Sequence, residues 1–560
     1  IVLWRMGGEP LRLRTADRMA AGERRDLRQR ILADGDLERV ARMAPELLKS
    51  GFDAGHGYPQ VWIRDLNTFI ETALQVHEPE VLRSQLLRFF AAQGPDGNIP
   101  DGLDAAGRAH KNTVETDQET SLIQAVARYV RVTGDRTILT ERVDDKTVLE
   151  RMGMALEFLR RNRWDEPRGL IWGATTADWG DVQPEDNPGV DLSDHSHRAV
   201  DIYDNAMLAI ALRDYIELAG PDAPDRARWA ALWRSVRNNV RLYLWTGSKF
   251  RPHLYLEGSP WPGEFNEQVI YYQGGTAVAI EAGLLEADEA ARSFETMIEN
   301  RIRAGATSIG LTLYPAYPAG FFQNPQMDRP YSYQNGGDWT WFGGRIIRQM
   351  IRHGYIEAAY EELRPMVRRV IENKGFYEWY TLDGRPRGSG AFRGSAGVLA
   401  TAIDELRVWA AAEQTDRLSE HVRLIAGPVN GAVIEQDGRC LVVYGAPADK
   451  VRTAERVLFT HARRDVAEAG RPLVDRGAVA VVPAAEEAFF REPRRFWEDW
   501  PQKRFYDFEQ QTTKILTEPI PLGRTVKGGD VLDWRGLAIE VVDTPGCTRG
   551  AVSYLSLIHI

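Results

Sequence analysis

The chain has 560 residues, of which 43% are hydrophobic and 27% are charged, as in an ordinary globular protein. Its formal net charge of −10 offers no attraction to nucleic acid, and no apolar run approaches the roughly 20 residues that a membrane helix needs, so we expect neither partner. The presence of only two cysteines, Cys440 and Cys547, excludes a disulfide framework.

Amphipathic helices are predicted between residues 22 and 412, because apolar side chains recur there at spacings of three and four. Taken in pairs, these helices form six hairpins, which can close a double ring whose loops make a pocket at one end. The sequence therefore predicts a mainly α fold, an (α/α)6 toroid over residues 1–412. The predicted ranges are 23–49, 65–77, 79–92, 117–133, 146–163, 203–218, 226–243, 273–283, 287–301, 338–352, 355–373 and 394–412.

After about residue 415, short β-rich runs interleave with helical stretches, which is typical of an α/β sandwich. We expect a linker at 413–421 and a second domain at 422–554. The predicted strands are Gly431–Gln436, Cys440–Tyr444, Arg456–Thr460, Ala478–Val482 and Leu537–Val542.

Both ends of the sequence are typical of a fragment. The first residue is Ile1 rather than Met, and residues 555–560 resemble a translated sequencing-adapter tail, which we expect to be non-native. A natural apolar C-terminal strand is the alternative. No secretory signal opens the sequence, so we expect a cytoplasmic protein.

One loop carries the first candidate for catalysis of glycoside cleavage, which needs a proton donor for the leaving oxygen and a second carboxylate. In Ala177-Asp-Trp-Gly-Asp181, two acids flank a tryptophan. An aromatic wall excludes water and favours the protonated form of a carboxyl, which suits a general acid. We prefer Asp181 as this acid and keep Asp178 as the alternative, while helix capping explains the loop about equally well.

The second candidate is Glu378, in Gly375-Phe-Tyr-Glu-Trp-Tyr380. A glutamate among three aromatic residues is unusual on a solvated surface. We expect it to act as the general base toward water. A surface glutamate beside aromatic core residues is the alternative, and Glu372 and Asp383 are less aromatic candidates nearby.

Other residues are typical of groups that position a sugar. Arg64 offers a fork of donors beside the acceptor Asp65, and together they can bind vicinal hydroxyls, although a structural ion pair at a helix start is common. Aromatic and amide groups also gather at 333–341, where a helix cap with core tryptophans is the alternative. The expected substrate-binding residues are Trp62, Arg64, Asp65, Trp179, Gln334, Asn335, Asp338, Trp339 and Tyr377.

The order of four motifs resembles six-hairpin glycosidases, nearest to alkaline/neutral invertases and the glucosidase part of glycogen-debranching enzymes. The motifs are Trp62-Ile-Arg-Asp65, Ala177-Asp-Trp-Gly-Asp181, Tyr333-Gln-Asn-Gly-Gly-Asp-Trp339 and Tyr377-Glu-Trp-Tyr380. The resemblance covers roughly residues 50–412. It implies an (α/α)6 toroid, a reaction without metal or cofactor, and inversion at the anomeric carbon.

The resemblance also implies residue roles. The acid maps to Asp181 or Asp178, the second carboxylate to Glu378, and Arg64 with Asp65 to the non-reducing-end subsite, which implies exo action on a small oligosaccharide or glycoside with a glucoside-like terminal sugar. The aspartate loop departs from the invertase pattern, which argues against sucrose. An inverting pair of carboxyls would lie roughly 6.5–9.5 Å apart.

The C-terminal part resembles the beginning of a metallo-β-lactamase-type domain, with an αββα-like fold. The segment 458–466 stands where that superfamily carries its His-x-His-x-Asp-His motif, and 543–548 matches a later Thr-Pro-Gly-His segment. His461, Asp465 and Cys547 are the candidate zinc ligands. A binuclear zinc site needs about five or six protein ligands, and Arg463 opposes a cation, so we expect a metal-free domain.

Three other functions stay open on the sequence. One is a metal-dependent hydrolase that acts through the C-terminal domain, and another is a non-catalytic carbohydrate-binding protein. The third is a phosphorylase, which would use phosphate in place of water.

Overall fold

The computed structural model describes residues 11–110, 117–185, 195–411, 421–425, 429–446, 450–498 and 516–556. The chain divides into two compact units, Ile1–Ala411 and Ala412–Ile560. Of the predicted linker 413–421, only His421 lies within the described residues. Within the described part of the chain, no helix is long and apolar enough to cross a membrane.

Six helices form the inner ring of the first unit. Each packs against the next in chain order, and the last packs back against the first, so the ring closes. These helices are buried over most of their length, which explains why several of them are apolar on every side. They are α3 (Ile63–Ala73), α5 (Asp117–Thr133), α7 (Ile202–Ala219), α9 (Gln273–Glu281), α11 (Thr340–Arg352) and α13 (Arg393–Ala411).

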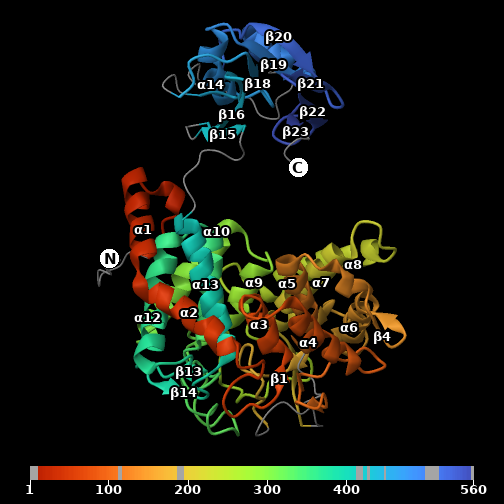
Figure 1. Cartoon of the computed structure of the whole chain (residues 1–560), viewed down its shortest axis with the longest axis vertical. Helices are drawn as coiled ribbons and strands as arrows, with labels where there is room; N and C mark the ends of the chain where they lie inside the picture. Colours follow the sequence, from red (N-terminus) through yellow and green to blue (C-terminus); the bar gives the residue numbers. More distant parts are fainter. Residues whose placement is uncertain are drawn as a thin grey trace. The chain divides into compact units, whose positions relative to one another are not determined.

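Six outer helices cover this ring, each connected in sequence to the inner helix that follows it. They bury one apolar stripe and expose the opposite face, as the periodicity of three and four predicts. The closed double ring confirms the expected (α/α)6 toroid (Figure 1). The outer helices are α2 (Gly35–Leu48), α4 (Pro79–Ala91), α6 (Val148–Asn162), α8 (Arg226–Asn239), α10 (Ala287–Ala304) and α12 (Ile356–Asn373).

The first predicted helix, 23–49, is two helices in the structure, α1 (Ala21–Ala33) and α2. The break lies at Asp34, whose side chain accepts hydrogen bonds from the backbone N–H groups of Asp36 and Leu37 and so caps α2. An aspartate at this position is a strong helix N-cap. The helix α1 packs on α13, outside the double ring.

Short strands and single helical turns organise the loops of the first unit. Strands β1, β13 and β14 lie at one end of this unit (Figure 1). The strands are β1 (Val61–Trp62), β2 (Gly102–Leu103), β3 (Ala109–His110), β4 (Arg142–Val143), β5 (Lys146–Thr147), β6 (Trp164–Asp165), β7 (Leu170–Ile171), β8 (Gly173–Ala174), β9 (Arg198–Val200), β10 (Leu254–Tyr255), β11 (Tyr271–Tyr272), β12 (Leu313–Tyr314), β13 (Trp379–Tyr380) and β14 (Pro386–Arg387). Turns of 3-10 helix lie at Ala16–Arg18, Arg136–Thr140 and Glu267–Val269, and a π-helical turn at Val240–Leu244.

The second unit has two facing sheets and a helical layer. In the first sheet, of order β15-β16-β17-β18-β19-β20, the strands β17 to β20 run parallel, while the pairs β15–β16 and β16–β17 are antiparallel. Neighbouring residues on its strands bury opposite faces: Val457 packs toward the helices, while Leu458 packs toward the second sheet. The first sheet comprises β15 (Val422–Ile425), β16 (Gly431–Gln436), β17 (Arg439–Val443), β18 (Arg456–Leu458), β19 (Val479–Pro483) and β20 (Leu522–Val526). The helices are α14 (Arg464–Val474), α15 (Glu487–Arg491) and α16 (Pro493–Glu498), with a 3-10 turn at Ala484–Glu486.

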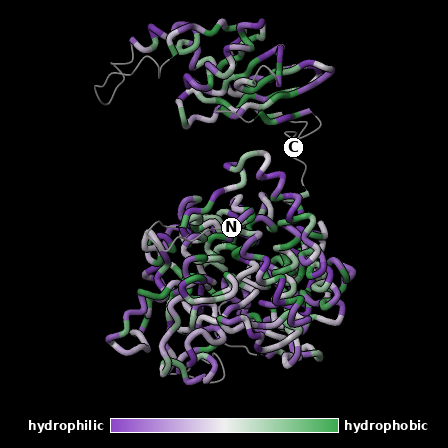
Figure 2. The backbone as a smooth tube through the Cα atoms, turned by 90° about the vertical axis from the view of Figure 1, so that its left-hand side faces the viewer, coloured by the Kyte–Doolittle hydropathy of each residue, from purple (hydrophilic) through white to green (hydrophobic). Residues whose placement is uncertain are grey.

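The second sheet, β21 (Val531–Trp534), β22 (Leu537–Asp543) and β23 (Val552–Ser556), is antiparallel. Leu555 and Ser556, the first two residues of the expected non-native tail, pair with Glu540 and Ile539 of β22. Residues 557–560 lie outside the described residues. Along both units, hydrophobic and hydrophilic residues alternate closely, in keeping with half-buried helices and strands (Figure 2).

Candidate active site

A small cavity of about 70 Å³ lies where the inner helices α3, α11 and α13 begin. Three carboxyl groups and one guanidinium line it, among seven aromatic side chains, two of which are tyrosines. Such a mixture can stack on a sugar ring and bind its hydroxyls. The lining residues are Ala54, Tyr58, Trp62, Arg64, Asp65, Trp179, Asp181, Tyr333, Gln334, Trp339, Trp341, Glu378 and Phe392.

Glu378 stands directly before the β13–β14 hairpin and is 3% exposed. The Tyr58 hydroxyl donates to both of its carboxylate oxygens, at 3.0 and 3.2 Å, and the Ser389 N–H donates at 3.1 Å. Burial raises the pKa of Glu378 to about 7, against these hydrogen bonds, which lower it. Gly388 has a φ of +67°, and a Cβ there would lie 2.1 Å from the Glu378 carboxylate, so this turn requires glycine.

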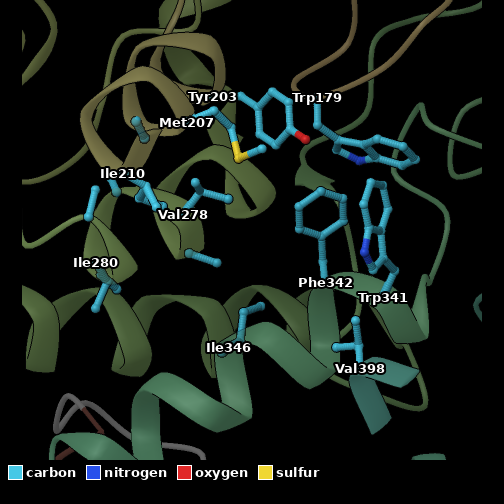
Figure 3. Close-up of a cluster of buried hydrophobic side chains, with 14 of the residues drawn as sticks. Trp179, Tyr203, Met207, Ile210, Val278, Ile280, Trp341, Phe342, Ile346 and Val398 are labelled. Atoms are coloured by element: carbon cyan, nitrogen blue, oxygen red, sulfur yellow. The ribbon is translucent and has the colours of Figure 1, made fainter. Parts of the chain in front are cut away.

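Asp181 is joined to Gln334 by two reciprocal hydrogen bonds. Gln334 Nε2 donates to Asp181 Oδ1 at 2.6 Å, and the Asp181 N–H donates to Gln334 Oε1 at 3.2 Å. Two residues earlier, the Trp179 ring packs edge-on against Trp339 and Trp341, with centroids 4.9 and 4.8 Å apart. Figure 3 shows the rings of Trp179, Trp341 and Phe342 gathered beside the apolar core. Trp179, Trp339 and Trp341 line the same cavity as Asp181.

Asp178, the alternative acid, does not line the cavity. Its side chain is 2% exposed, and its Oδ1 accepts a 2.8 Å hydrogen bond from the N–H of Gly275 in the first turn of α9. Burial raises the pKa of Asp178 to about 8, and the hydrogen bonds from α9 oppose this rise. Asp181 therefore lines the cavity, whereas Asp178 is buried beside the first turn of α9.

Arg64 and Asp65 both line the cavity, at the start of α3. Arg64 forms a two-pronged ion pair with Asp117, one arm of which spans 3.1 Å, and Tyr203 donates to the same carboxylate at 3.0 Å. Within the described residues, no protein group donates a hydrogen bond to the Asp65 side chain. Burial raises the pKa of Asp65 to about 7, with Arg64 lowering it and the charges of Glu378 and Asp181 raising it.

Three expected substrate-binding residues lie outside the cavity lining. Asn335 is fully buried and holds the loop by bonding the backbone of Tyr317 and Met327. Asp338 is also fully buried and accepts from Ser308 and pairs with Arg369 at 2.9 Å.

Tyr377 packs its ring edge-on toward Tyr380, with ring centroids 6.1 Å apart. Trp62, Trp179, Gln334 and Trp339 do line the cavity.

The sequence of this chain matches a family of known enzymes. The sequence model of the amylo-alpha-1,6-glucosidase family matches residues 44–381, which is more than half of the chain. The chain belongs to this family. It is a glycoside hydrolase, and the matched segment contains both Asp181 and Glu378. No curated protein matches the chain.

Several solved structures are similar to this member of the family. The GH63 mannosylglycerate hydrolase from Thermus thermophilus, in complex with Tris, is 18% identical with a TM-score of 0.48, covering 64% of this chain and 99% of that chain. A rhamnosidase from Klebsiella oxytoca is 12% identical with a TM-score of 0.45, covering 66% of this chain and 63% of that chain. A GH78 rhamnosidase of Bacillus sp. GL1 is 14% identical with a TM-score of 0.47, covering 74% of this chain and 41% of that chain.

Three residues of the cavity lining, Ala54, Tyr58 and Phe392, were missed from the sequence. Tyr333 and Trp341 also line it; they bound the segment 333–341 but were not among the expected binding residues. Tyr58 is the most informative of these, because it contacts Glu378 from 320 positions away in the chain. A tyrosine within the Gly-rich run Gly55-His-Gly-Tyr58, just before the Trp62 motif, is the only local signal for it. Asp117, which forms the ion pair with Arg64, belongs to no recognisable sequence motif.

In the second unit, His461, Asp465 and Cys547 are the candidate metal ligands. His461 Nδ1 lies 2.7 Å from the Thr460 hydroxyl, Asp465 pairs with Arg463, and Cys547 is exposed. Among the residues that the structure describes, no three His, Cys, Asp or Glu side chains gather as metal ligands.

Proposed function

We propose that the toroid is an exo-acting, inverting glycoside hydrolase that releases a glucoside-like terminal sugar from a small oligosaccharide or glycoside. Asp181 is the general acid and Glu378 the general base. One observation carries this proposal: two carboxyls from loops 197 positions apart line a single small, aromatic cavity. Membership of the glycosidase family supports the same reaction class.

In this mechanism the bond between the anomeric carbon and the leaving oxygen breaks as Asp181 gives that oxygen a proton. A water molecule attacks the anomeric carbon from the opposite face and gives its proton to Glu378. The two donors on Glu378, Tyr58 and the Ser389 N–H, favour its ionised form, which a base requires. A pKa of about 7 makes Glu378 a stronger base than an exposed glutamate.

The exo action is supported by the polar groups of the cavity. Asp65 presents an acceptor to it, and Arg64 is held in place by Asp117, so both can bind the hydroxyls of a terminal sugar. The substrate is expected to be a small neutral sugar derivative.

A panel of α- and β-glucosides, mannosides, sucrose and trehalose, incubated with the full chain, tests this proposal. Release of a monosaccharide should fall about 10²–10⁴-fold in Asp181→Asn and in Glu378→Gln. The matched control is Asp288→Asn, an exposed aspartate of α10 that pairs with Arg292. Undiminished release in either active-site variant would contradict the assigned roles, and release of a sugar phosphate only with phosphate would identify a phosphorylase.

For the second unit we propose a relation to the metallo-β-lactamase fold, supported by its helical layer over two facing sheets. The residues present do not fit zinc, because Arg463 pairs with Asp465 and the three candidate ligands are not grouped. We therefore assign this unit no metal-dependent step. Metal analysis of the purified chain should find no stoichiometric zinc, and one zinc per chain would contradict this assignment.

A further inference from the structure

We propose that Asp178 is a positioning residue, which fixes the loop of the general acid to the N-terminus of α9. The proposal rests on the proposed function of Asp181, and it gives the second aspartate of the loop a role distinct from proton donation. Its basis is the geometry of the segment 176–181.

The Asp178 side chain points away from the cavity and into the fold. Its Oδ1 accepts the 2.8 Å hydrogen bond from Gly275, whose N–H belongs to the first turn of α9 and has no partner within the helix. The side chain is 2% exposed, so water does not compete for this contact. The positive end of the α9 dipole stabilises a polar or negative group here.

The first turn of α9 is shaped around this carboxyl. A Cβ on Gly274 would lie 2.7 Å from Asp178 Oδ2, and a Cβ on Gly275 would lie 2.8 Å from Oδ1. The same atoms would also meet Phe342 at 2.9 Å and Ile202 at 2.5 Å. Two successive glycines in a helix cost stability relative to alanine, and here they open the space that the Asp178 carboxyl fills.

The hydrogen bond between Asp178 and Gly275 fixes a tight turn that leads to Asp181. Asp178 has a left-handed φ of +56°, which is unfavourable for a residue other than glycine and needs support from its surroundings. The Thr176 hydroxyl donates to the Asp178 carbonyl at 3.2 Å, and the Gly180 N–H donates to Ala177 O at 3.1 Å. Asp181 follows immediately, so a shift of this turn displaces the acid.

The test compares Asp178→Asn with Asp178→Ala in the full chain. Asparagine keeps an acceptor for the Gly275 N–H, and below pH 8 it matches a carboxyl whose pKa burial raises to about 8. We expect Asp178→Asn to keep kcat within about threefold. Asp178→Ala should lose about 10–100-fold in kcat with KM changed less than about threefold, because small misplacements of a catalytic group cost about that much.

Hydrogen exchange of the segment 175–183 gives a readout that does not depend on turnover. Protection should fall in Asp178→Ala and stay near wild type in Asp178→Asn. Gly275→Ala, which crowds the carboxyl from the helix side, should loosen the segment in the same way and covers the case in which Asp178→Ala does not fold. The control is Gly22→Ala, because a Cβ at Gly22 meets nothing within 4 Å.

The outcomes separate this proposal from the proposed function. If the wild type cleaves no glycoside, the proposed function fails. The exchange data alone then test whether Asp178 fixes the loop to α9. Unchanged exchange in both Asp178→Ala and Gly275→Ala would overturn this role of Asp178. Loss of turnover in Asp178→Asn equal to that in Asp181→Asn would overturn it as well, because Asp178 would then be the acid.

Discussion

Gln334 and Asp181 bind each other reciprocally, since the amide nitrogen of Gln334 donates to Asp181 Oδ1 at 2.6 Å and its amide oxygen accepts the Asp181 N–H at 3.2 Å. A primary amide is suited to this pairing because it offers a donor and an acceptor side by side. A Cβ on Gly180 would lie 2.7 Å from Gln334 Oε1, so glycine is needed for the close approach. The orientation of the Asp181 carboxyl therefore depends on a residue 153 positions away.

Replacing Gln334 by alanine should lower kcat by about 10–100-fold, because a hydrogen bond to a charged or acidic group contributes about 1.5–3 kcal/mol. Steady-state kinetics on the best substrate of the panel measure this. The control is Gln268→Ala, which removes an exposed glutamine of a 3-10 turn. A kcat equal to that of the control would mean that Gln334 does not orient the acid.

Tyr58→Phe should shift the pH dependence of kcat/KM. The hydrogen bond from Tyr58 lowers the pKa of Glu378, so its loss raises this pKa above about 7. A base must be ionised, so activity is lost as pH falls through the pKa, and the acidic limb should move up by roughly 0.5–1 unit, a shift on the order of one hydrogen bond. Because neighbouring carboxyls titrate together, the apparent pKa of the acidic limb is a property of the coupled carboxyls rather than of Glu378 alone.

The pH profile of Tyr243→Phe, a tyrosine outside the cavity lining, is the control for this shift. A limb that moves to lower pH in Tyr58→Phe would show that the hydroxyl does not stabilise the ionised form of Glu378.

Asp178→Asn should stabilise the fold more at pH 9 than at pH 5. Burial raises the pKa of Asp178 from 3.8 to about 8, so the folded state binds a proton that the unfolded state releases. The stability that this proton contributes is fully present below about pH 4 and is lost as pH rises toward 8. Asparagine has no such proton, and the difference in Tm between variant and wild type should grow with pH. A difference that is constant from pH 5 to 9 would contradict this.

Glu281→Gln should destabilise the toroid by about 3–5 kcal/mol, the usual effect of removing one partner of a buried ion pair. At the end of α9, Glu281 pairs with Arg128 at 3.1 Å and with Arg345 at 2.9 Å, and these arginines lower its pKa despite burial. Denaturant unfolding at neutral pH measures the loss. The exposed pair Glu46–Lys49 provides the control, since Glu46→Gln should cost less than about 1 kcal/mol.

The helical toroid could be predicted because periodicity is a local property of the sequence. The break at Asp34 was missed because apolar spacing continues through it, whereas the cap depends on the backbone conformation of a single residue. The carboxyls Asp181 and Glu378 were found because each has aromatic neighbours in sequence, and both line the cavity.

The sequence predicted the roles of residues less well where their contacts are with residues far away in the chain. Asp338 beside Trp339 has the same local pattern as a sugar-binding acid, but its contacts with Ser308 and Arg369 make it an internal support of the loop. Tyr58 reaches Glu378 because the ring closes, and Asp117 reaches Arg64 because α5 packs against α3. Such contacts follow from the three-dimensional arrangement and produce no pattern of residue spacing in the sequence.

We propose that Asp181 and Glu378 cleave a terminal glycosidic bond with inversion. The most direct test is proton NMR of the anomeric signals during the first turnovers of the full chain on its best substrate. We predict that the inverted anomer of the free monosaccharide appears first, before mutarotation, and that Asp181→Asn and Glu378→Gln abolish its appearance. Initial release of the retained anomer, or unchanged release by either variant, would contradict this account.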